Sequence, residues 1–281
     1  MRARIWQVED LATSRTVHPF EAIDYPRLPA KPRATGLTSV LDGGLGNNEV
    51  RDRVAVAGEW IDVVKLGWGT ARLTPAAALY EKVAIYRAAG IRVCSGGTFL
   101  EIAFAQNRVA EFLAGARELG LAMVEVSNGV SSMSQKDKVG LIARARSAGF
   151  TVWSEVGKKD ANEDASISVE ERCAAVEREL AAGADKVILE ARESGTVGIY
   201  DRSGAPAEAL IRRIVQCVGP ERLVFEAPRK DQQVWMVQAL GARVNLGNVA
   251  PHEALALATL RTGLRADTFR ETHERCSAVP V

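Results

Sequence analysis

Short apolar runs rich in β-branched residues alternate along most of the chain with longer segments whose apolar residues recur at helical spacing. We predict the short runs as eight β-strands: Thr38–Leu41, Asp62–Leu66, Arg92–Cys94, Met123–Val126, Thr151–Ser154, Lys186–Leu189, Leu223–Phe225 and Arg243–Leu246. We predict the longer segments as helices, among them Pro75–Ala89, Phe99–Leu119, Lys136–Ala148 and Val169–Ala182. Several of these segments end in glycine, which supplies a left-handed C-cap before the next strand.

This alternation fits two architectures, an open doubly wound sheet and a closed barrel. Even spacing of the eight runs and the absence of a GxGxxG motif after the first of them favour the barrel. We therefore predict the α/β class: a single (β/α)8 TIM barrel over residues 36–270, with an N-terminal extension over 1–35 and a tail over 271–281. Prolines interrupt regular structure in the extension, which we expect to lie over the barrel or to reach a neighbouring subunit.

Five charged residues fall within or at the ends of the predicted strands: Lys65, Glu125, Glu155, Glu190 and Glu226. A charge inside a strand is costly unless it is paired, hydrogen-bonded or bound to a metal. Any one of the five could belong to a buried ion pair. In a barrel, however, the residues beyond the C-terminal ends of the strands face one shared pocket. Five charges at that mouth predict a functional site.

Acidic side chains from neighbouring strands, without cysteine or histidine partners, suit a hard cation with oxygen ligands, and Mg²⁺ fits best. We expect its ligands to come from Glu125, Glu155 and Glu190, with Asp42 and Glu226 as alternatives. Basic residues follow the same strand ends and are candidates for binding an anion: Lys65, Lys158, Lys159, Arg192, Arg229 and Lys230. Glycines beside them would let backbone N–H groups approach that anion.

Composition excludes several classes of function. The chain has 36 Lys and Arg against 35 Asp and Glu, a formal net charge of +1, which offers no basic stripe for nucleic acid and no polybasic membrane anchor. No apolar run approaches the ~18 residues of a membrane span, and the first residues lack the apolar stretch expected of a signal peptide. We therefore expect a cytoplasmic protein with small anionic partners and no nucleic acid or membrane partner.

Cysteine and histidine chemistry is not expected at the site. The four cysteines, at positions 94, 173, 217 and 276, are widely scattered and predict free thiols rather than a zinc site or a disulfide framework. Of the three histidines, only His252 comes soon after a predicted strand. Acid–base work therefore falls to a lysine or a carboxylate, and a lysine beside other cations can exchange protons near neutral pH.

Several motifs at the predicted strand ends resemble those of one known family, phosphosulfolactate synthase. They are Val64–Thr70, Gly96–Thr98, Ser154–Lys159, Arg192–Gly195, Phe225–Pro228, Asn245–Asn248, Leu260–Arg261, Gly263–Arg265 and Asp267–Phe269. The resemblance runs from about Gly36 to Phe269. Members of this family are magnesium-dependent (β/α)8 lyases that add sulfite to phosphoenolpyruvate on the way to coenzyme M.

The resemblance implies a mechanism and a set of site residues. Mg²⁺ would bind the phosphoenolpyruvate carboxylate, sulfite would add to the methylene carbon, and Lys159 would protonate the adjacent carbon, giving (2R)-3-phosphosulfolactate. The residues alone do not separate Lys158 from Lys159. Lys65 and Glu155 would complete the catalytic set, in a protein expected to be a homo-oligomer. Substrate contacts are expected from Gly97, Thr98, Arg192, Ser194, Gly195, Arg229, Lys230, Asn245 and Asn248.

Three positions depart from the archaeal pattern of the family. Gly43 stands where that pattern has Lys, Asn128 where it has Asp, and Val130 where it has Ser. A positive and a negative charge are lost together, which is either a compensated pair or a sign of a changed nucleophile or substrate. One alternative is therefore a barrel enzyme that adds a different nucleophile to an enol phosphate. The other is a non-catalytic stress or interaction protein like the plant heat-stress barrels. The presence of Lys65, Glu155 and the other rim charges argues against it, because a protein without catalysis has little need of them.

Overall fold

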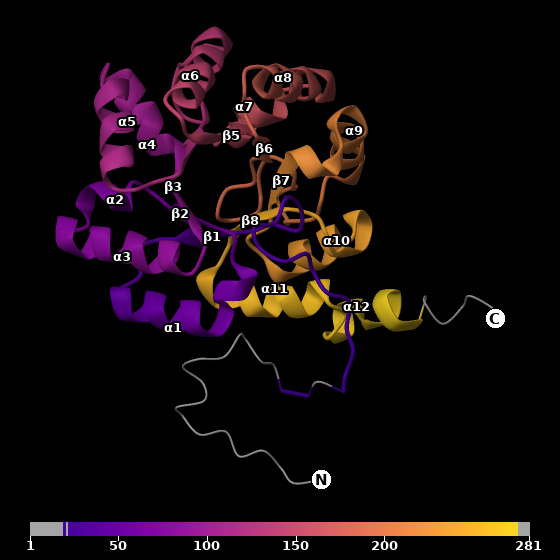
Figure 1. Cartoon of the computed structure of the whole chain (residues 1–281). Helices are drawn as coiled ribbons and strands as arrows, with labels where there is room; N and C mark the ends of the chain where they lie inside the picture. The colour runs from indigo at the N-terminus through magenta and orange to yellow at the C-terminus, as the bar shows by residue number, and fades with distance from the viewer. Residues whose placement is uncertain (1–18, 21, 275–281) are drawn as a thin grey trace.

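In the computed structural model, which describes residues 19–20 and 22–274, eight parallel strands form one sheet that curls into a nearly closed barrel (Figure 1). The strands are β1 (Thr38–Asp42), β2 (Val63–Leu66), β3 (Arg92–Ser95), β4 (Met123–Val126), β5 (Thr151–Val156), β6 (Lys186–Leu189), β7 (Leu223–Glu226) and β8 (Leu246–Val249). Their order in the sheet is β3-β2-β1-β8-β7-β6-β5-β4. The predicted (β/α)8 barrel is confirmed.

Helices surround the strands on the outside of the barrel (Figure 1). They are α1 (Asn47–Ala57), α2 (Thr70–Leu73), α3 (Ala76–Ala88), α4 (Gly97–Ala105), α5 (Val109–Glu118), α6 (Gln135–Ser147), α7 (Ala161–Ala165), α8 (Val169–Ala181), α9 (Glu208–Val218), α10 (Lys230–Leu240), α11 (Ala254–Arg261) and α12 (Ala266–Phe269). The short 3₁₀-helices are η1 (Gly58–Trp60), η2 (Pro220–Arg222) and η3 (Pro251–Glu253), and η4 (Arg270–Glu274) is a short π-helix. No helix in the described residues is long and apolar enough to cross a membrane.

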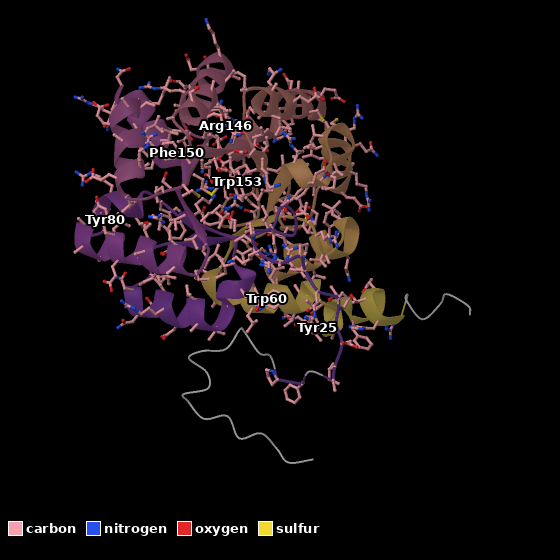
Figure 2. The ribbon with its side chains drawn as sticks, in the orientation of Figure 1. Tyr25, Trp60, Tyr80, Arg146, Phe150 and Trp153 are labelled. Atoms are coloured by element: carbon pink, nitrogen blue, oxygen red, sulfur yellow. The ribbon has the colours of Figure 1, made fainter. Side chains whose placement is uncertain are left out.

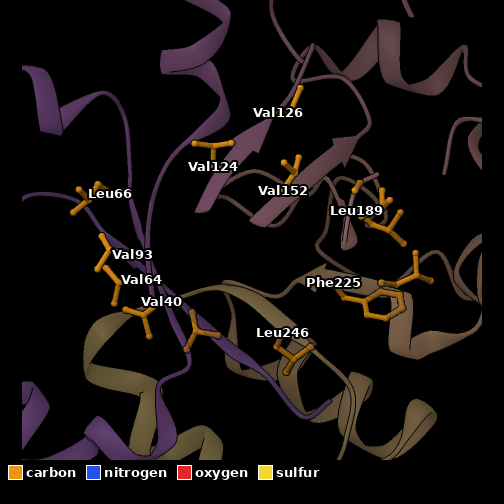
Figure 3. Packing of buried hydrophobic residues seen from close by; sticks show 14 of the residues in the cluster. Val40, Val64, Leu66, Val93, Val124, Val126, Val152, Leu189, Phe225 and Leu246 are labelled. Carbon is orange, nitrogen blue, oxygen red and sulfur yellow. The ribbon is translucent and has the colours of Figure 1, made fainter. Parts of the chain in front are cut away.

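Period-two alternation along the strands separates two faces of the sheet. One face packs against the helices through residues such as Val64, Val124 and Phe225 (Figure 3). The opposite face fills the barrel with a second apolar cluster: Leu37, Val63, Cys94, Met123, Trp153, Ile188 and Val224. Figure 2 shows Trp153 near the middle of the molecule. The five charged residues of the site each follow a member of this cluster by two positions. They therefore lie on the same face of the sheet, and their side chains point into the mouth of the barrel.

Two predicted elements differ from the structure by more than two residues. The predicted helix Phe99–Leu119 is interrupted after α4, because Asn107 adopts a left-handed backbone (φ 54°), which an α-helix cannot continue through. The predicted strand Arg243–Leu246 lies three residues too early. The strand continues through Gly247, which pairs with Glu226 in the ladder. A Cβ on Gly247 would lie 3.2 Å from Val224 Cγ1, so this close approach of neighbouring strands favours glycine.

The described part of the N-terminal extension reaches the end of the barrel where the strands begin. Arg33 Nη1 lies 3.1 Å from Asp62 Oδ1, just before β2, and Lys31 donates a hydrogen bond to the carbonyl of Gly58. Residues 1–18, 21 and 275–281, with His18 and Cys276, lie outside the described residues. The three described cysteines are free thiols, although Cys173 on α8 and Cys217 on α9 bring their sulfurs to 2.7 Å.

Candidate active site

The five charged strand residues meet at the C-terminal mouth of the barrel. Lys65, Glu125, Glu190 and Glu226 line a cavity of about 250 Å³ there, together with Lys159 from the loop after β5. Glu155, the fifth, lies directly behind Lys159. All four glutamates are at most 2% exposed. Two lysines and four buried carboxylates therefore share one small volume, and their pairing decides what the site can do.

Lys65 is held between two carboxylates. Its Nζ lies 3.1 Å from Glu226 Oε1 and 3.3 Å from Glu125 Oε2. Burial opposes its charge, but Glu125, Glu226 and Glu155 together hold the pKa of Lys65 well above its ordinary value. Glu226 also accepts a hydrogen bond from the N–H of Ala191, 3.0 Å away. Lys65 is thus a fixed positive charge at the base of the cavity.

Lys159 is placed differently. Its Nζ lies 3.6 Å from Glu190 Oε2 and 3.8 Å from Glu155 Oε1, and about a quarter of its side chain is exposed toward the cavity. The charge of Glu155, against the effect of burial, raises the pKa of Lys159 above its ordinary value. The side chain therefore carries a proton at neutral pH and presents it to the cavity. Its carboxylate neighbours correct the expectation of a lysine beside other cations: they hold the proton on Lys159, so it would pass to a strongly basic carbon rather than exchange freely near neutral pH.

Glu155 and Glu190 have opposite tendencies to ionise. Burial raises the pKa of Glu190 well above its ordinary value, and the nearby charges of Glu155 and Glu226 add to the effect. Burial also opposes ionisation of Glu155, but Lys159 and Lys65 outweigh it and lower the pKa of Glu155. The two neighbouring carboxylates therefore do not ionise alike, because the charge on Glu155 disfavours the charge on Glu190.

A divalent cation fits beside this pair. Glu155 Oε1 and Glu190 Oε2 are buried and have no hydrogen-bond partner; the Lys159 ammonium, 3.6–3.8 Å away, compensates their charge only at longer range. Among the residues that the structure describes, no group of three or more His, Cys, Asp and Glu side chains is arranged to hold a metal. Mg²⁺ is often bound by only one or two carboxylates, with water and substrate oxygens completing its shell. Glu155 and Glu190 fit that pattern.

The other expected metal ligands have different partners. Glu125 accepts a hydrogen bond from the N–H of Gly97, 2.8 Å away, and pairs with Lys65, so it does not join Glu155 and Glu190 in one group. Asp42 accepts hydrogen bonds from two backbone N–H groups and from Tyr86, and it pairs with Lys82 at 3.2 Å. Both carboxylates are thus already engaged by donors of the protein itself.

Only part of the expected substrate-binding set reaches the cavity. Gly97, Thr98, Arg192 and Asn248 line it. Lys158 does not, because its Nζ donates to the carbonyl of Asn128 and its backbone N–H to Asp164. The remaining members are engaged elsewhere, and none of them lines this cavity: Ser194 with Thr196, Gly195 with Gln232, Arg229 with Asp231 and Lys230 with Asp267.

Three residues around the cavity hold a left-handed backbone that L-residues rarely adopt. They are Trp68 (φ 53°), Arg192 (φ 59°) and Asn248 (φ 52°). Such conformations cost of order 1–3 kcal/mol each and cluster at functional sites. Trp68 was not among the expected contacts. Its ring occupies the space beside Gly43, where a Cβ would lie 2.2 Å from Trp68 Cζ3, so a side chain at position 43 requires the ring to move.

Asn245 lies at the opposite end of the barrel, which corrects its expected place among the substrate contacts. Its amide accepts from the N–H of Leu37 (3.1 Å) and donates to the carbonyl of Leu223 (2.8 Å), and both residues lie where strands begin. The position follows from the late start of β8. The side chain thus hydrogen-bonds the beginnings of the neighbouring strands β1 and β7 to the residue just before β8.

We predict that Asn245→Ala lowers the free energy of unfolding by about 1–3 kcal/mol, because it leaves buried backbone groups without partners. The KM for the substrate should stay the same. Urea unfolding and steady-state kinetics check the two parts separately. A raised KM without loss of stability would contradict this prediction and indicate that Asn245 contacts the substrate.

Comparison with known proteins agrees with the motifs. The family model for (2R)-phospho-3-sulfolactate synthase (ComA) matches residues 26–267. Phosphosulfolactate synthase of Methanothermobacter thermautotrophicus is 41% identical over 251 residues, which cover 89% of this chain and 97% of that protein. The Bacillus subtilis phosphosulfolactate synthase is 41% identical over 249 residues, 88% of this chain and 98% of the relative.

Solved structures with low sequence identity share the fold. A 3-hexulose-6-phosphate synthase superposes with a TM-score of 0.52 at 16% identity, covering 80% of this chain and 98% of that one. A phosphonopyruvate hydrolase superposes with a TM-score of 0.51 at 13% identity, covering 87% of each chain. These likenesses support the barrel alone. Because the family model and the relatives at 41% identity each span more than four-fifths of the chain, the resemblance of the motifs is confirmed, and the chain belongs to the phosphosulfolactate synthase family.

Proposed function

We propose that this chain catalyses the magnesium-dependent addition of sulfite to phosphoenolpyruvate, giving (2R)-phospho-3-sulfolactate. The chain belongs to this family, and the observation that carries the proposal is how lysines and carboxylates pair at the mouth of its barrel. One lysine is fixed between two carboxylates, and a second faces the cavity beside two carboxylate oxygens that have no hydrogen-bond partner. We further propose that the protein acts in the cytoplasm as a homo-oligomer on small anions.

Charge is the first difficulty of this reaction, because both substrates are anions. Lys65, Lys159 and Arg192 supply positive charge around the cavity. Thr98 follows Gly97 in the first turn of α4. Its hydroxyl and the N-terminal end of this helix both favour an anion. Preorganised groups of this kind stabilise charge that develops in the transition state, since they need no reorientation during the reaction.

Glu155 and Glu190 are the residues that would hold Mg²⁺. When bound, the ion would neutralise negative charge that builds up on the substrate carboxylate as the nucleophile adds. In the addition, the sulfur lone pair of sulfite forms the bond to the methylene carbon, and the electrons of the double bond move onto the adjacent carbon and the carboxylate. Lys159 Nζ then delivers its proton to that adjacent carbon and is reprotonated from solvent. No oxidant or reductant is needed.

The proposal is tested by following phosphoenolpyruvate and product by ³¹P NMR with sulfite present or absent. Conversion that depends on both sulfite and Mg²⁺ supports it. Consumption of phosphoenolpyruvate without sulfite would indicate another nucleophile. No conversion under any of these conditions would remove the proposed activity.

Magnesium dependence can be assigned to particular carboxylates. Excess chelator should abolish product formation, and added Mg²⁺ should restore it. In Glu155→Gln, the Mg²⁺ concentration for half-maximal rate should rise at least ~10-fold, because the substitution removes a proposed ligand. Glu125→Gln is the matched control, since Gly97 and Lys65 already engage that carboxylate. An equal shift in both variants would contradict the two-carboxylate assignment.

A further inference from the structure

The barrel has one seam without a strand ladder. The sheet order starts at β3 and ends at β4, and within the described residues these two neighbours share no backbone pairing. Elsewhere around the barrel each strand is hydrogen-bonded to the next. Backbone groups near such a seam need other partners, because buried N–H and C=O groups are almost always hydrogen-bonded.

Glu101, on α4 after β3, supplies partners across the seam. Its carboxylate accepts hydrogen bonds from the Ser127 hydroxyl and from the N–H groups of Gly129 (3.0 Å), Val130 (3.1 Å) and Ser131 (2.7 Å). All four donors belong to the loop that follows β4. One side chain therefore fixes the course of this loop.

A second carboxylate crosses the seam in the opposite direction. Glu125, on β4, accepts the N–H of Gly97, the first residue of α4. A Cβ on Gly97 would lie 2.4 Å from Ser127 Oγ, so glycine is needed for this approach. The start of α4 and the loop after β4 are thus joined reciprocally, where the sheet itself leaves them unjoined.

The loop that Glu101 holds is in contact with the proton donor. The carbonyl of Gly129 accepts the backbone N–H of Lys159 at 3.1 Å. A Cβ on Gly129 would lie 3.0 Å from Lys159 Cε, so the lysine side chain packs closely over this residue. Val130, the next residue, lines the cavity. A shift of the loop would therefore move Lys159 relative to Glu155 and Glu190.

The carboxylate of Glu101 is well suited to this task. Glu101 is 2% exposed, and burial opposes its ionisation, yet hydrogen bonds from Ser127, Ser131 and Val130 lower the pKa of Glu101 below its ordinary value. It is therefore charged at neutral pH. Hydrogen bonds to an ionised acceptor are about twice as strong as neutral ones, so four of them hold the loop firmly.

We propose that Glu101 is a positioning residue of the active site: it closes the β3–β4 seam and orients Lys159 through the loop after β4. Its effect on turnover rests on the proposed function, whereas its effect on Lys159 does not. Nothing in the proposal requires Glu101 to touch substrate.

Glu101→Gln is the sharpest test, because it keeps the size of the side chain but turns one acceptor oxygen into a donor. That NH₂ group must face backbone N–H groups, so the loop should loosen. We expect kcat to fall on the order of 10–100-fold, as misplacement of a reacting group by about 1 Å can cost 10²-fold. KM should change much less. Amide hydrogen exchange should accelerate in residues 127–131 and at Lys159.

Asp62→Asn is the matched control. Asp62 is also a buried carboxylate that accepts a backbone N–H, from Thr38 at 2.9 Å, and it pairs with Arg33, but it lies at the opposite end of the barrel. Its loss should lower thermal stability without changing kcat or exchange at 127–131. Equal losses of kcat in both variants, scaling with stability alone, would overturn the positioning role.

The chemical reactivity of Lys159 tests the inference independently of enzymatic turnover. The rate at which an amine-reactive reagent modifies Lys159, measured by mass spectrometry of its peptide, should change in Glu101→Gln and not in Asp62→Asn. Unchanged kcat together with unchanged Lys159 reactivity would refute the inference. A wild-type protein that adds no sulfite would contradict the proposed function, and Lys159 reactivity would then decide the role of Glu101 alone.

Discussion

Lys159→Ala is expected to lower kcat by ~10²–10⁴-fold, the range that positioned acid–base groups contribute. Lys159 Nζ faces the cavity beside Glu155 and Glu190 and carries a proton. Its removal leaves nothing in the same place to protonate the substrate carbon. Binding of phosphoenolpyruvate and Mg²⁺ should remain largely intact, which titration calorimetry can check independently of turnover.

Lys158→Ala is the internal control for this prediction. The neighbouring lysine donates to the carbonyl of Asn128 and lies outside the cavity, so kcat should change only a few-fold. If Lys159 merely neutralised a substrate charge, Lys159→Ala would raise KM and leave kcat nearly unchanged. A larger loss of kcat in Lys158→Ala would reverse the assignment of the two lysines.

Lys65→Met should cause the second large effect, on both stability and activity. Glu125 and Glu226 would lose the charge that sits 3.1–3.3 Å from their oxygens, while both remain buried. Removing one partner of a buried ion pair costs about 3–5 kcal/mol, because the remaining charge is uncompensated. Denaturant unfolding of the two proteins measures this loss directly.

The loss should depend on pH in a definite direction. In Lys65→Met, Glu125 loses the nearby positive charge that counteracts burial, so its pKa, already raised by burial, rises further above the unfolded value. Folding is then penalised at high pH, where the unfolded chain ionises freely. The stability deficit should therefore shrink between about pH 8 and about pH 5. The double variant Lys65→Met/Glu226→Gln should recover part of the deficit. A deficit that stays constant with pH would show that lost packing, not charge, is responsible.

Hydrophobic alternation predicted the barrel because it is a direct consequence of which face of each strand is buried. The same alternation located the mouth: residues two positions after Val63, Met123, Trp153, Ile188 and Val224 share their face of the sheet. Five charges at these positions had to meet. Pattern therefore predicted the rim charges correctly, and the family motifs separated Lys159 from Lys158.

Loop side chains were less predictable, because their direction depends on long-range partners. Arg229 and Lys230 follow a strand end, yet pairing with Asp231 and Asp267 turns them away from the cavity. Glu101 was missed altogether, although one signal was present in the sequence. It is the only charge in the apolar helix GTFLEIAFA, and a charge on such a helix must be explained by a partner.

The account is tested most directly by one reaction in D₂O: wild-type protein, Mg²⁺, sulfite and ¹³C-labelled phosphoenolpyruvate, with the product read by ¹³C NMR. We predict a new carbon–sulfur bond at the former methylene carbon and a single deuterium on the adjacent carbon, delivered from exchanged Lys159. In Lys159→Ala this product should be almost absent. Formation of pyruvate and phosphate, deuterium at the methylene carbon, or equal product from the Lys159→Ala variant would contradict it.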